Sequence, residues 1–328
     1  DSLDIRTSQR EGLPDAGSRS DVETHADARL TIATSIAPKE IEKQARAIES
    51  WIKLGFRPVS VNCIEEIDAL RESFPQVEFV PAKRDAREVF GKPLIYFDDF
   101  LEYFRQGDFE FGGIVNSDVF LTGDEGIIPF IESQARDSLV YGSRINVDSL
   151  EVLEGEVYEQ GFDFFFFHKS LIPRIPKTEF CIGATWWDYW APLIAALEGF
   201  QIKRLVGPFA YHVRHRFRWD HKQWISLGQK CFAYLIDKAN ENFYEDPDTN
   251  PWALLAKIFY TNHNGDTRWS GRNDKMLPGV FCSSILEFLE KKSLRIGYAG
   301  NRPPVRRDGA EPVKKKRDIL IHKTDSAM

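Results

Sequence analysis

The chain has 328 residues, 42% of them apolar, so it is long enough for one large domain or for a domain with a helical appendix. Its formal net charge of −7 argues against a protein whose main partner is a nucleic acid. The four cysteines, at positions 63, 181, 231 and 282, form no Cys-x-x-Cys pair, and no apolar run is long enough to span a membrane. These features predict reduced thiols and a cytoplasmic location. The first residue is Asp rather than Met, so a preceding segment is left open.

Order is predicted to begin at Arg29, because residues 1–28 are polar and lack apolar periodicity. Short apolar runs predict strands at 30–35, 58–62 and 77–80. Between these runs, apolar residues that recur every three to four positions predict helices at 40–54 and 64–74. This β-α-β-α-β order is typical of the nucleotide-binding half of a doubly wound sheet. No Gly-x-Gly-x-x-Gly and no P-loop motif follows the first strand, which argues against a dinucleotide fold and a P-loop enzyme.

The stretch 111–122 (FGGIVNSDVFLT) is the most informative part of this half. Two apolar runs flank the polar triplet Asn116, Ser117 and Asp118, which places the carboxylate at the end of a central strand. A carboxylate at that edge supplies a hard oxygen ligand for a divalent ion that carries a diphosphate. An ordinary turn Asp is the alternative.

A second group of residues follows further along the chain. The run 162–168 is rich in Phe and predicts a buried strand, within which Asp163 needs a partner or a function because an unpaired buried carboxylate is costly. The segment 181–190 leads into an apolar helix predicted at 191–197, and Asp188 falls in the first helical turn. It is surrounded in the sequence by Trp186, Trp187, Tyr189 and Trp190. Such a carboxylate can deprotonate a hydroxyl while the rings stack on an acceptor, or it can simply cap a helix in an aromatic core.

The segment 211–221 holds three His and three Arg residues. His212 and His215 are candidate metal ligands, with His212 preferred because it directly follows an apolar stretch. Arg214, Arg216 or Arg218 could hold a leaving diphosphate. A structural His cluster with solvated Arg residues is the alternative.

The other predicted elements complete an α/β chain: strands at 138–142 and 202–206, and helices at 93–104, 126–135, 223–240, 252–260 and 283–290. Residues 236–300 are expected to form a helical C-terminal extension and 301–328 a polar tail. The tail has a basic run at 314–317, which either is solvated or makes peripheral contact with the inner face of a membrane.

With these motifs in this order, residues 29–235 resemble the nucleotide-sugar-dependent glycosyltransferases of the GT-A fold, in particular members from bacterial polysaccharide pathways. The resemblance implies a Rossmann-related, mixed but mostly parallel sheet flanked by helices. It implies Mn²⁺ or Mg²⁺ on Asp118 and a His, a UDP- or GDP-sugar donor, a glycan or lipid-linked glycan acceptor, and no nucleic acid partner. In the inverting members an acid at the position of Asp188 is the base.

The resemblance also implies roles for further residues. Donor contacts are expected from Thr34, Ser35, Asn62, Lys92, Asn116, Ser117 and Arg214, and acceptor contacts from Asp163, Trp186, Trp187 and Trp190. Thr34 or Ser35 could instead cap the next helix. Lys92 or Arg84 could neutralise the charge of the diphosphate, or both could belong to a solvated basic face. The motif reads Asn-Ser-Asp where the family has an acidic first position, which leaves open weak metal dependence. A retaining mechanism, a non-catalytic carbohydrate-binding scaffold and a sugar nucleotidyltransferase are the alternatives.

Overall fold

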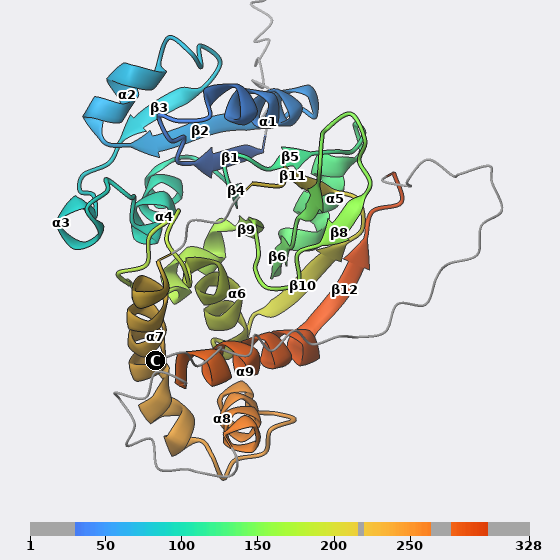
Figure 1. Cartoon of the computed structure of the whole chain (residues 1–328). Helices are drawn as coiled ribbons and strands as arrows, with labels where there is room; N and C mark the ends of the chain where they lie inside the picture. Colours follow the sequence, from blue (N-terminus) through green and yellow to red (C-terminus); the bar gives the residue numbers. More distant parts are fainter. Residues whose placement is uncertain (1–29, 216–219, 264–276, 301–328) are drawn as a thin grey trace, which may run out of the picture.

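The computed structural model describes residues 30–215, 220–263 and 277–300, and the description that follows refers to these (Figure 1). Its main sheet has eight strands in the order β12-β10-β6-β9-β4-β1-β2-β3. The strands are β1 (Thr31–Thr34), β2 (Arg57–Asn62), β3 (Glu78–Pro81), β4 (Phe111–Val115), β6 (Ser138–Gly142), β9 (Phe164–His168), β10 (Gln201–Val206) and β12 (Ser293–Gly297). Only β9 runs antiparallel to its neighbours β4 and β6, so the sheet is mixed and mostly parallel, as predicted.

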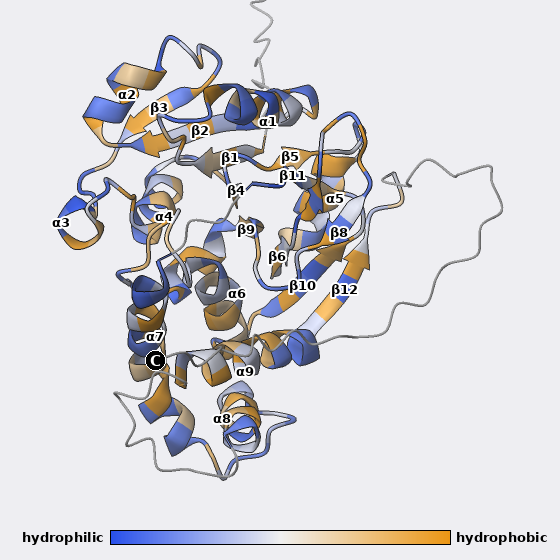
Figure 2. Ribbon diagram, in the orientation of Figure 1, coloured by the Kyte–Doolittle hydropathy of each residue, from blue (hydrophilic) through white to orange (hydrophobic). Residues whose placement is uncertain are grey.

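Helices cover both faces of this sheet. They are α1 (Ile41–Lys53), α2 (Ile64–Leu70), α3 (Arg87–Phe90), α4 (Phe97–Gln106), α5 (Ile127–Ala135), α6 (Trp187–Leu197), α7 (His221–Glu241), α8 (Pro251–Asn262) and α9 (Leu277–Lys292), with a 3₁₀ turn at Lys169–Arg174. In Figure 1 α7, α8 and α9 gather beyond α6, and these helices contact one another. Figure 2 shows hydrophobic stretches along the strands and a largely hydrophilic visible side on α1.

The strand β9 shows how the two cores form on opposite faces of the sheet. Successive side chains of a strand point to opposite faces. Accordingly Phe165 and Phe167 belong to the core beneath α4 and α6, and Phe164 and Phe166 belong to the core beneath α1 and α5. A run of Phe residues is therefore the expected composition of a central strand that is buried on both faces. The prediction of a buried strand here is confirmed, although its antiparallel direction was not foreseen.

Two glycines of β4 let the neighbouring aromatic rings approach the strand. A Cβ at Gly112 would lie 2.6 Å from the Phe104 ring, and one at Gly113 would lie 2.6 Å from the Phe166 ring. Because real Cβ atoms do not come so close, larger residues would push these rings away. The two glycines thereby bring helix α4 and strand β9 onto the strand that leads to Asp118.

A second, smaller sheet lies at the end of β4. It has the order β5-β11-β7-β8 and contains β5 (Phe120–Leu121), β7 (Ile145–Val147), β8 (Gly155–Val157) and β11 (Ala210–Val213). The strand β5 follows β4 after a short turn, and β11 pairs with both β5 and β7. This sheet brings chain segments from three parts of the sequence to one edge of the main sheet.

The predicted elements are found with shifted ends. The helix expected at 93–104 spans 97–106, that at 64–74 ends at 70, and the last helix begins at 277 instead of 283. A short helix, α3, lies between β3 and α4, where no element was predicted. Strands β7, β8, β11 and β12 were not predicted, because three to five residues flanked by charged or polar neighbours carry little periodicity.

Two predicted segments lie outside the described residues: the leader at 1–28 and the tail at 301–328 with its basic run. Among the helices that the structure describes, none combines the length and the apolar character needed to cross a membrane.

Candidate active site

Asp118 lies in the turn between β4 and β5, and the register of the small sheet carries His212 to it. Tyr211 pairs with Phe120 and Ala210 with Leu121 in an antiparallel ladder. Continuing that register brings the end of β11 beside the turn that holds Asp118. Two residues that are 94 positions apart thus meet, with His212 Nε2 3.1 Å from Asp118 Oδ2.

His215 completes a cluster with these two residues. Its Nε2 lies 3.7 Å from Asp118 Oδ2, and its ring centroid is 4.9 Å from that of His212. One ligand atom from each of the three residues can be chosen so that all lie within 4.8 Å of one another. The side chain of His212 is 2% exposed, that of Asp118 28% and that of His215 37%, so the cluster opens to solvent on one side.

The hydrogen bonds around His212 fix which of its nitrogens carries the proton. Arg144 Nε donates to Asn146 Oδ1 at 3.0 Å, which identifies that atom as the amide oxygen. His212 Nδ1 lies 3.2 Å from the same oxygen, so it must donate. In the neutral ring Nε2 is then a bare lone pair that faces the Asp118 carboxylate. An imidazole held in this way by an outer carbonyl is the arrangement that metal-binding histidines adopt.

A lysine that the sequence analysis did not single out reaches into the cluster. Lys43 Nζ lies 3.4 Å from Asp118 Oδ2 and 3.2 Å from His212 Nε2, and it donates to the Val213 carbonyl at 3.1 Å. Lys43 belongs to the first turn of α1, the helix that follows the first strand. This position near the carboxyl end of β1 was the available signal, but a lysine on the polar side of a helix is usually solvated.

The charge states of the cluster follow from burial and from these contacts. Burial lowers the pKa of His212, although the neighbouring Asp118 acts to raise it. The lowered pKa favours the neutral ring. Burial alone would raise the pKa of Asp118, but its contacts with His212 and His215 and the charge of Lys43 hold that pKa well below its usual range. Since a neutral His212 with its proton on Nδ1 cannot donate to Asp118, we assign most of this effect to Lys43 and His215.

Asp188 is connected to the turn after β4 through residues 162 and 163, which directly precede β9. Its Oδ2 accepts a hydrogen bond from the Phe162 amide at 3.2 Å, and the carboxylate lies in the first turn of α6, as predicted. The next residue, Asp163, accepts from the Asn116 amide at 3.0 Å through its carbonyl. Burial raises the pKa of Asp188 to about 7, and the nearby Asp163 charge adds to the effect of burial.

Asp163 has the partner that its burial requires. It is 2% exposed and forms an ion pair with Arg144, and its Oδ1 also accepts from Asn116 Nδ2 at 2.9 Å. Asn116 therefore holds Asp163 rather than an ion, and Ser117 donates to Gln44 Oε1 at 2.8 Å. These contacts leave the Asp163 carboxylate paired with Arg144 and the Asn116 amide directed toward Asp163. The triplet acts by fixing the turn that presents Asp118.

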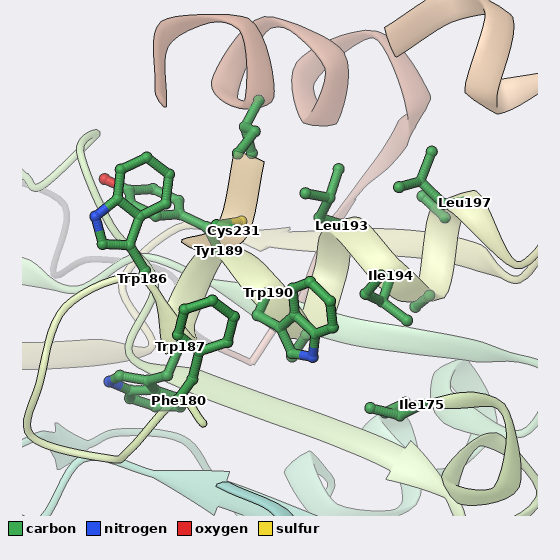
Figure 3. Packing of buried hydrophobic residues seen from close by; sticks show 14 of the residues in the cluster. Ile175, Phe180, Trp186, Trp187, Tyr189, Trp190, Leu193, Ile194, Leu197 and Cys231 are labelled. Carbon is green, nitrogen blue, oxygen red and sulfur yellow. The ribbon is translucent and has the colours of Figure 1, made fainter. Parts of the chain in front are cut away.

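The three indoles expected at an acceptor site lie in the core instead (Figure 3). Trp186, Trp187 and Trp190 are 0%, 3% and 0% exposed. Trp187 packs against Phe165, and Trp190 against Phe180 and Tyr234. Rings enclosed in this way offer no face to a sugar, so the aromatic-core alternative describes them better. The physical reason is that α6 is buried almost all round between the sheet and α9.

Of the residues expected to contact a nucleotide, Ser35 and Asn62 lie at one polar end of the sheet. Asn62 Nδ2 donates to the Ile36 carbonyl at 2.8 Å and to Ser35 Oγ at 3.3 Å, which fixes the loop after β1. Asn62 is itself buried. The Thr34 hydroxyl is also buried and has no hydrogen-bond partner among the described residues, so Ser35 is the member of the pair that a ligand can reach.

The cations expected near the diphosphate lie apart from the Asp118 cluster or are paired. Arg214 is exposed and forms an ion pair with Asp148 at 2.9 Å. Arg84 lies over the Tyr96 ring and 3.5 Å from Asp98. Lys92 is exposed in the loop after α3. The two other candidates, Arg216 and Arg218, lie outside the described residues.

Two hollows elsewhere in the described part of the chain, of about 320 and 380 Å³, lie along α7 and beside α8. Neither is lined by a residue of the Asp118 cluster or by Asp188, so neither supplies a closed chamber for the site.

No protein-family model and no curated protein matches the chain. Its fold is similar to that of TarS from S. aureus, with 10% identity and a TM-score of 0.43 over 80% of this chain and 55% of that chain, so it spans about half of TarS. The mannosyltransferase PcManGT from Pyrobaculum calidifontis, in complex with GDP-Man and Mn2+, has 15% identity and a TM-score of 0.42 over 80% of this chain and 88% of that one. HddC from Yersinia pseudotuberculosis has 13% identity and a TM-score of 0.31 over 56% and 89%. Likenesses of this size identify neither a ligand nor a reaction.

Proposed function

We propose that this chain is a metal-dependent glycosyltransferase of the GT-A type, which moves a hexosyl group from a nucleotide diphosphate-sugar to a hydroxyl of a glycan. The observation that carries the proposal is the meeting of Asp118, His212 and His215 at the end of a central strand. Ligands of open α/β sheets bind at this edge. Another carboxylate, Asp188, has a raised pKa and is linked to the same edge through residues 162 and 163.

The donor set of the cluster fits a divalent ion. One carboxylate oxygen and two imidazole nitrogens are available, and the His212 lone pair is already directed at Asp118. Because imidazole suits Mn²⁺ better than Mg²⁺, which prefers an all-oxygen shell, we assign Mn²⁺ to this site. When bound, the ion neutralises the diphosphate and so makes it a better leaving group.

Asp188 is the residue to which we assign the base. Its pKa of about 7 matches the requirement that a general base be ready to accept a proton near neutral pH. The carboxylate takes the proton from the acceptor hydroxyl, and the hydroxyl oxygen forms its bond to the anomeric carbon. The bond from that carbon to the diphosphate breaks, and the configuration inverts because attack and departure occur on opposite sides.

The other residues have supporting roles in the proposal. Ser35 and Asn62 shape the loop that receives the base or ribose, and Ser117 keeps the Asp118 turn against α1. Lys92 and Arg214 remain candidates for contact with the diphosphate, which in the case of Arg214 requires it to leave Asp148. The donor is a UDP- or GDP-sugar and the acceptor a free or lipid-linked glycan of polysaccharide biosynthesis, handled in the cytoplasm.

The test is calorimetric titration of the full chain with UDP, GDP and CMP, each with Mn²⁺ and then with EDTA. We expect one nucleotide to bind at micromolar concentration and to lose at least tenfold in affinity in EDTA. Asp118→Ala should abolish the metal-dependent part, whereas Asp68→Ala, at an exposed position of α2, should not. Binding unaffected by EDTA would remove the ion, and no binding of any nucleotide would favour a non-catalytic scaffold.

A further inference from the structure

Lys43 occupies the place toward which the lone pairs of the cluster converge. An ammonium has three hydrogens to donate. The Lys43 ammonium has three acceptors at 3.1–3.4 Å: Asp118 Oδ2, His212 Nε2 and the Val213 carbonyl. Two of these are the atoms that a metal ion would use. The lysine is 19% exposed, so this is an enclosed contact rather than a surface ion pair.

The orientation of His212 makes this placement specific. Arg144 donates to Asn146 Oδ1, and that oxygen accepts from His212 Nδ1, so Nε2 is unprotonated in the neutral ring. This lone pair lies 3.1 Å from a carboxylate oxygen that also has only lone pairs to offer. Two such atoms repel each other unless a cation lies beside both. In the protein without a metal ion, the Lys43 ammonium is that cation.

We propose that Lys43 is a built-in competitor of the divalent ion, which must be displaced from Asp118 and His212 before the ion can bind. This inference rests on the proposed function, because it assumes that the cluster is an ion site. The lone pairs cannot serve both cations, and two positive charges at one place repel each other. The displaced ammonium, on its long flexible stem, requires a new anionic partner.

The diphosphate of the donor supplies such a partner, and this couples the two ligands. A metal ion that binds without diphosphate displaces the Lys43 ammonium from Asp118 and leaves it with no anionic partner in the cluster. An ion that arrives with a diphosphate brings anionic oxygens with it, to which Lys43 can turn. The free protein should therefore bind Mn²⁺ weakly, and diphosphate should strengthen that binding. Such coupling is reciprocal, so Mn²⁺ should strengthen diphosphate binding by the same factor.

The experiment measures Mn²⁺ binding from the electron paramagnetic resonance signal of the free ion, with and without inorganic pyrophosphate. We expect Lys43→Met to bind Mn²⁺ alone about tenfold more tightly than the unsubstituted protein. This factor corresponds to an ammonium that occupies the site in about nine of ten molecules. Pyrophosphate should strengthen Mn²⁺ binding in the unsubstituted protein and do so clearly less in the variant. Titrations of Mn²⁺ into pyrophosphate alone correct for binding in solution.

Lys53→Met is the matched control, because it removes the same charge from the exposed last turn of the same helix, about 15 Å away by helical rise. It should bind Mn²⁺ like the unsubstituted protein. Lys43→Gln is the second variant, in case Met at this position disturbs folding, and circular dichroism checks both.

The outcomes separate this inference from the proposed function. If Asp118→Ala loses Mn²⁺ but Lys43→Met and Lys43→Gln bind it no more tightly than the unsubstituted protein, the ion site stands and the competition is wrong. If neither the unsubstituted protein nor any lysine variant binds Mn²⁺ at millimolar concentration, the ion site and the competitor are both wrong. An equal gain in Lys53→Met would show a general charge effect and overturn the assignment to Lys43.

Discussion

The aromatic segment 186–190 and the Asp118 cluster were both predicted to be functional, but they differ in burial and in how the chain forms them. The aromatic segment 186–190 is continuous in the sequence and is buried in one core. The Asp118 cluster combines residues that are up to 97 positions apart in the numbering, and it lies at a partly exposed edge. A dense local group of unusual residues thus marks packing here, whereas the polar site is built from dispersed residues that a sheet edge brings together.

The difference has a physical basis. Aromatic rings bury large apolar areas, so a segment that is rich in them is drawn into the core unless something holds it outside. Carboxylates and imidazoles gain nothing from burial, and they remain near one another only where hydrogen bonds hold them. Asn146 provides such a bond for His212, and Arg144 in turn donates to the same oxygen of Asn146.

Asp188 connects the two regions, since it lies in the aromatic segment and its carboxylate accepts from the Phe162 amide, one residue before the Asp163 carbonyl that binds the Asn116 amide. We expect Asp188→Asn to reduce sugar transfer by about 10²- to 10⁴-fold, because the amide cannot accept a proton. Mn²⁺-dependent nucleotide binding should change little. Initial rates and calorimetry on the same preparation measure both. Undiminished transfer would return Asp188 to the role of a helix cap and make the aromatic segment purely structural.

Trp190→Ala tests the assignment of the indoles to the core. Its ring is fully buried against Phe180 and Tyr234, so truncation should lower the free energy of unfolding by about 3–5 kcal/mol. Trp190→Phe should cost less because it retains a ring. Urea unfolding measures the loss. A stable Trp190→Ala variant in which only the KM for the acceptor is raised would contradict the assignment to the core and would support stacking of Trp190 on the acceptor.

Asn146→Ala tests whether dispersed hydrogen bonds hold the polar site. It removes the oxygen that accepts from His212 Nδ1, so the imidazole loses its fixed orientation. We expect Mn²⁺ affinity to fall by about 10- to 100-fold, the usual effect of losing an outer partner of a ligand. Asn146→Asp keeps an acceptor oxygen and should lose less. Equal Mn²⁺ affinity in all three proteins would mean that His212 needs no such support.

The smallest expected effect is on the pH dependence of stability. The pKa of Asp188 is about 7 in the folded protein and near 4 in an unfolded chain. The folded state therefore binds more protons between these values, and stability falls as pH rises through this window. Compared with Asp188→Asn, the unsubstituted protein should lose about 1 kcal/mol between pH 6 and 7. Urea unfolding across this range measures the difference, and parallel curves would contradict the raised pKa.

Much of the main sheet was predictable from the sequence because its strands are buried on both faces. The runs that became β4 and β9 contain apolar residues and glycine over at least four consecutive positions, which is typical of a strand buried on both faces. The runs that became β1 and β2 mix Ile, Ala and Val with polar residues, and they were recognised as short β-rich segments between helical patterns. The strand β12 reads SLRIG after a helix that ends in two lysines, and its side chains are half-buried or exposed. Nothing in such a segment distinguishes an edge strand from a loop.

The candidate site was predictable to the extent that its residues carry rare chemistry. Asp118 follows a buried strand, and His212 follows an apolar run, so both can be recognised from the sequence alone. Lys43 could not be recognised, because whether a lysine on a helix meets solvent or a carboxylate depends on β11, whose sequence lies 170 positions away. Arg144 and Asn146 share this limitation, since their role is given by the pairing of β7 with β11.

The position of β12 has a consequence for how the chain protects itself from aggregation. Strand β12 pairs in parallel with one side of β10, and the other side of β10 pairs with β6. Helices α7, α8 and α9 separate β10 from β12 along the sequence. Without β12, the backbone amides and carbonyls of β10 would form an open margin that other chains could join. With β12 present, the edge strand of the sheet carries Arg295 at the middle of its pairing with β10, and the Arg295 guanidinium forms an ion pair with Glu290. A charged side chain at this position makes the addition of another strand less favourable. Strand β12 thus replaces the bare backbone of β10 at this margin with a short edge strand that carries a charged pair.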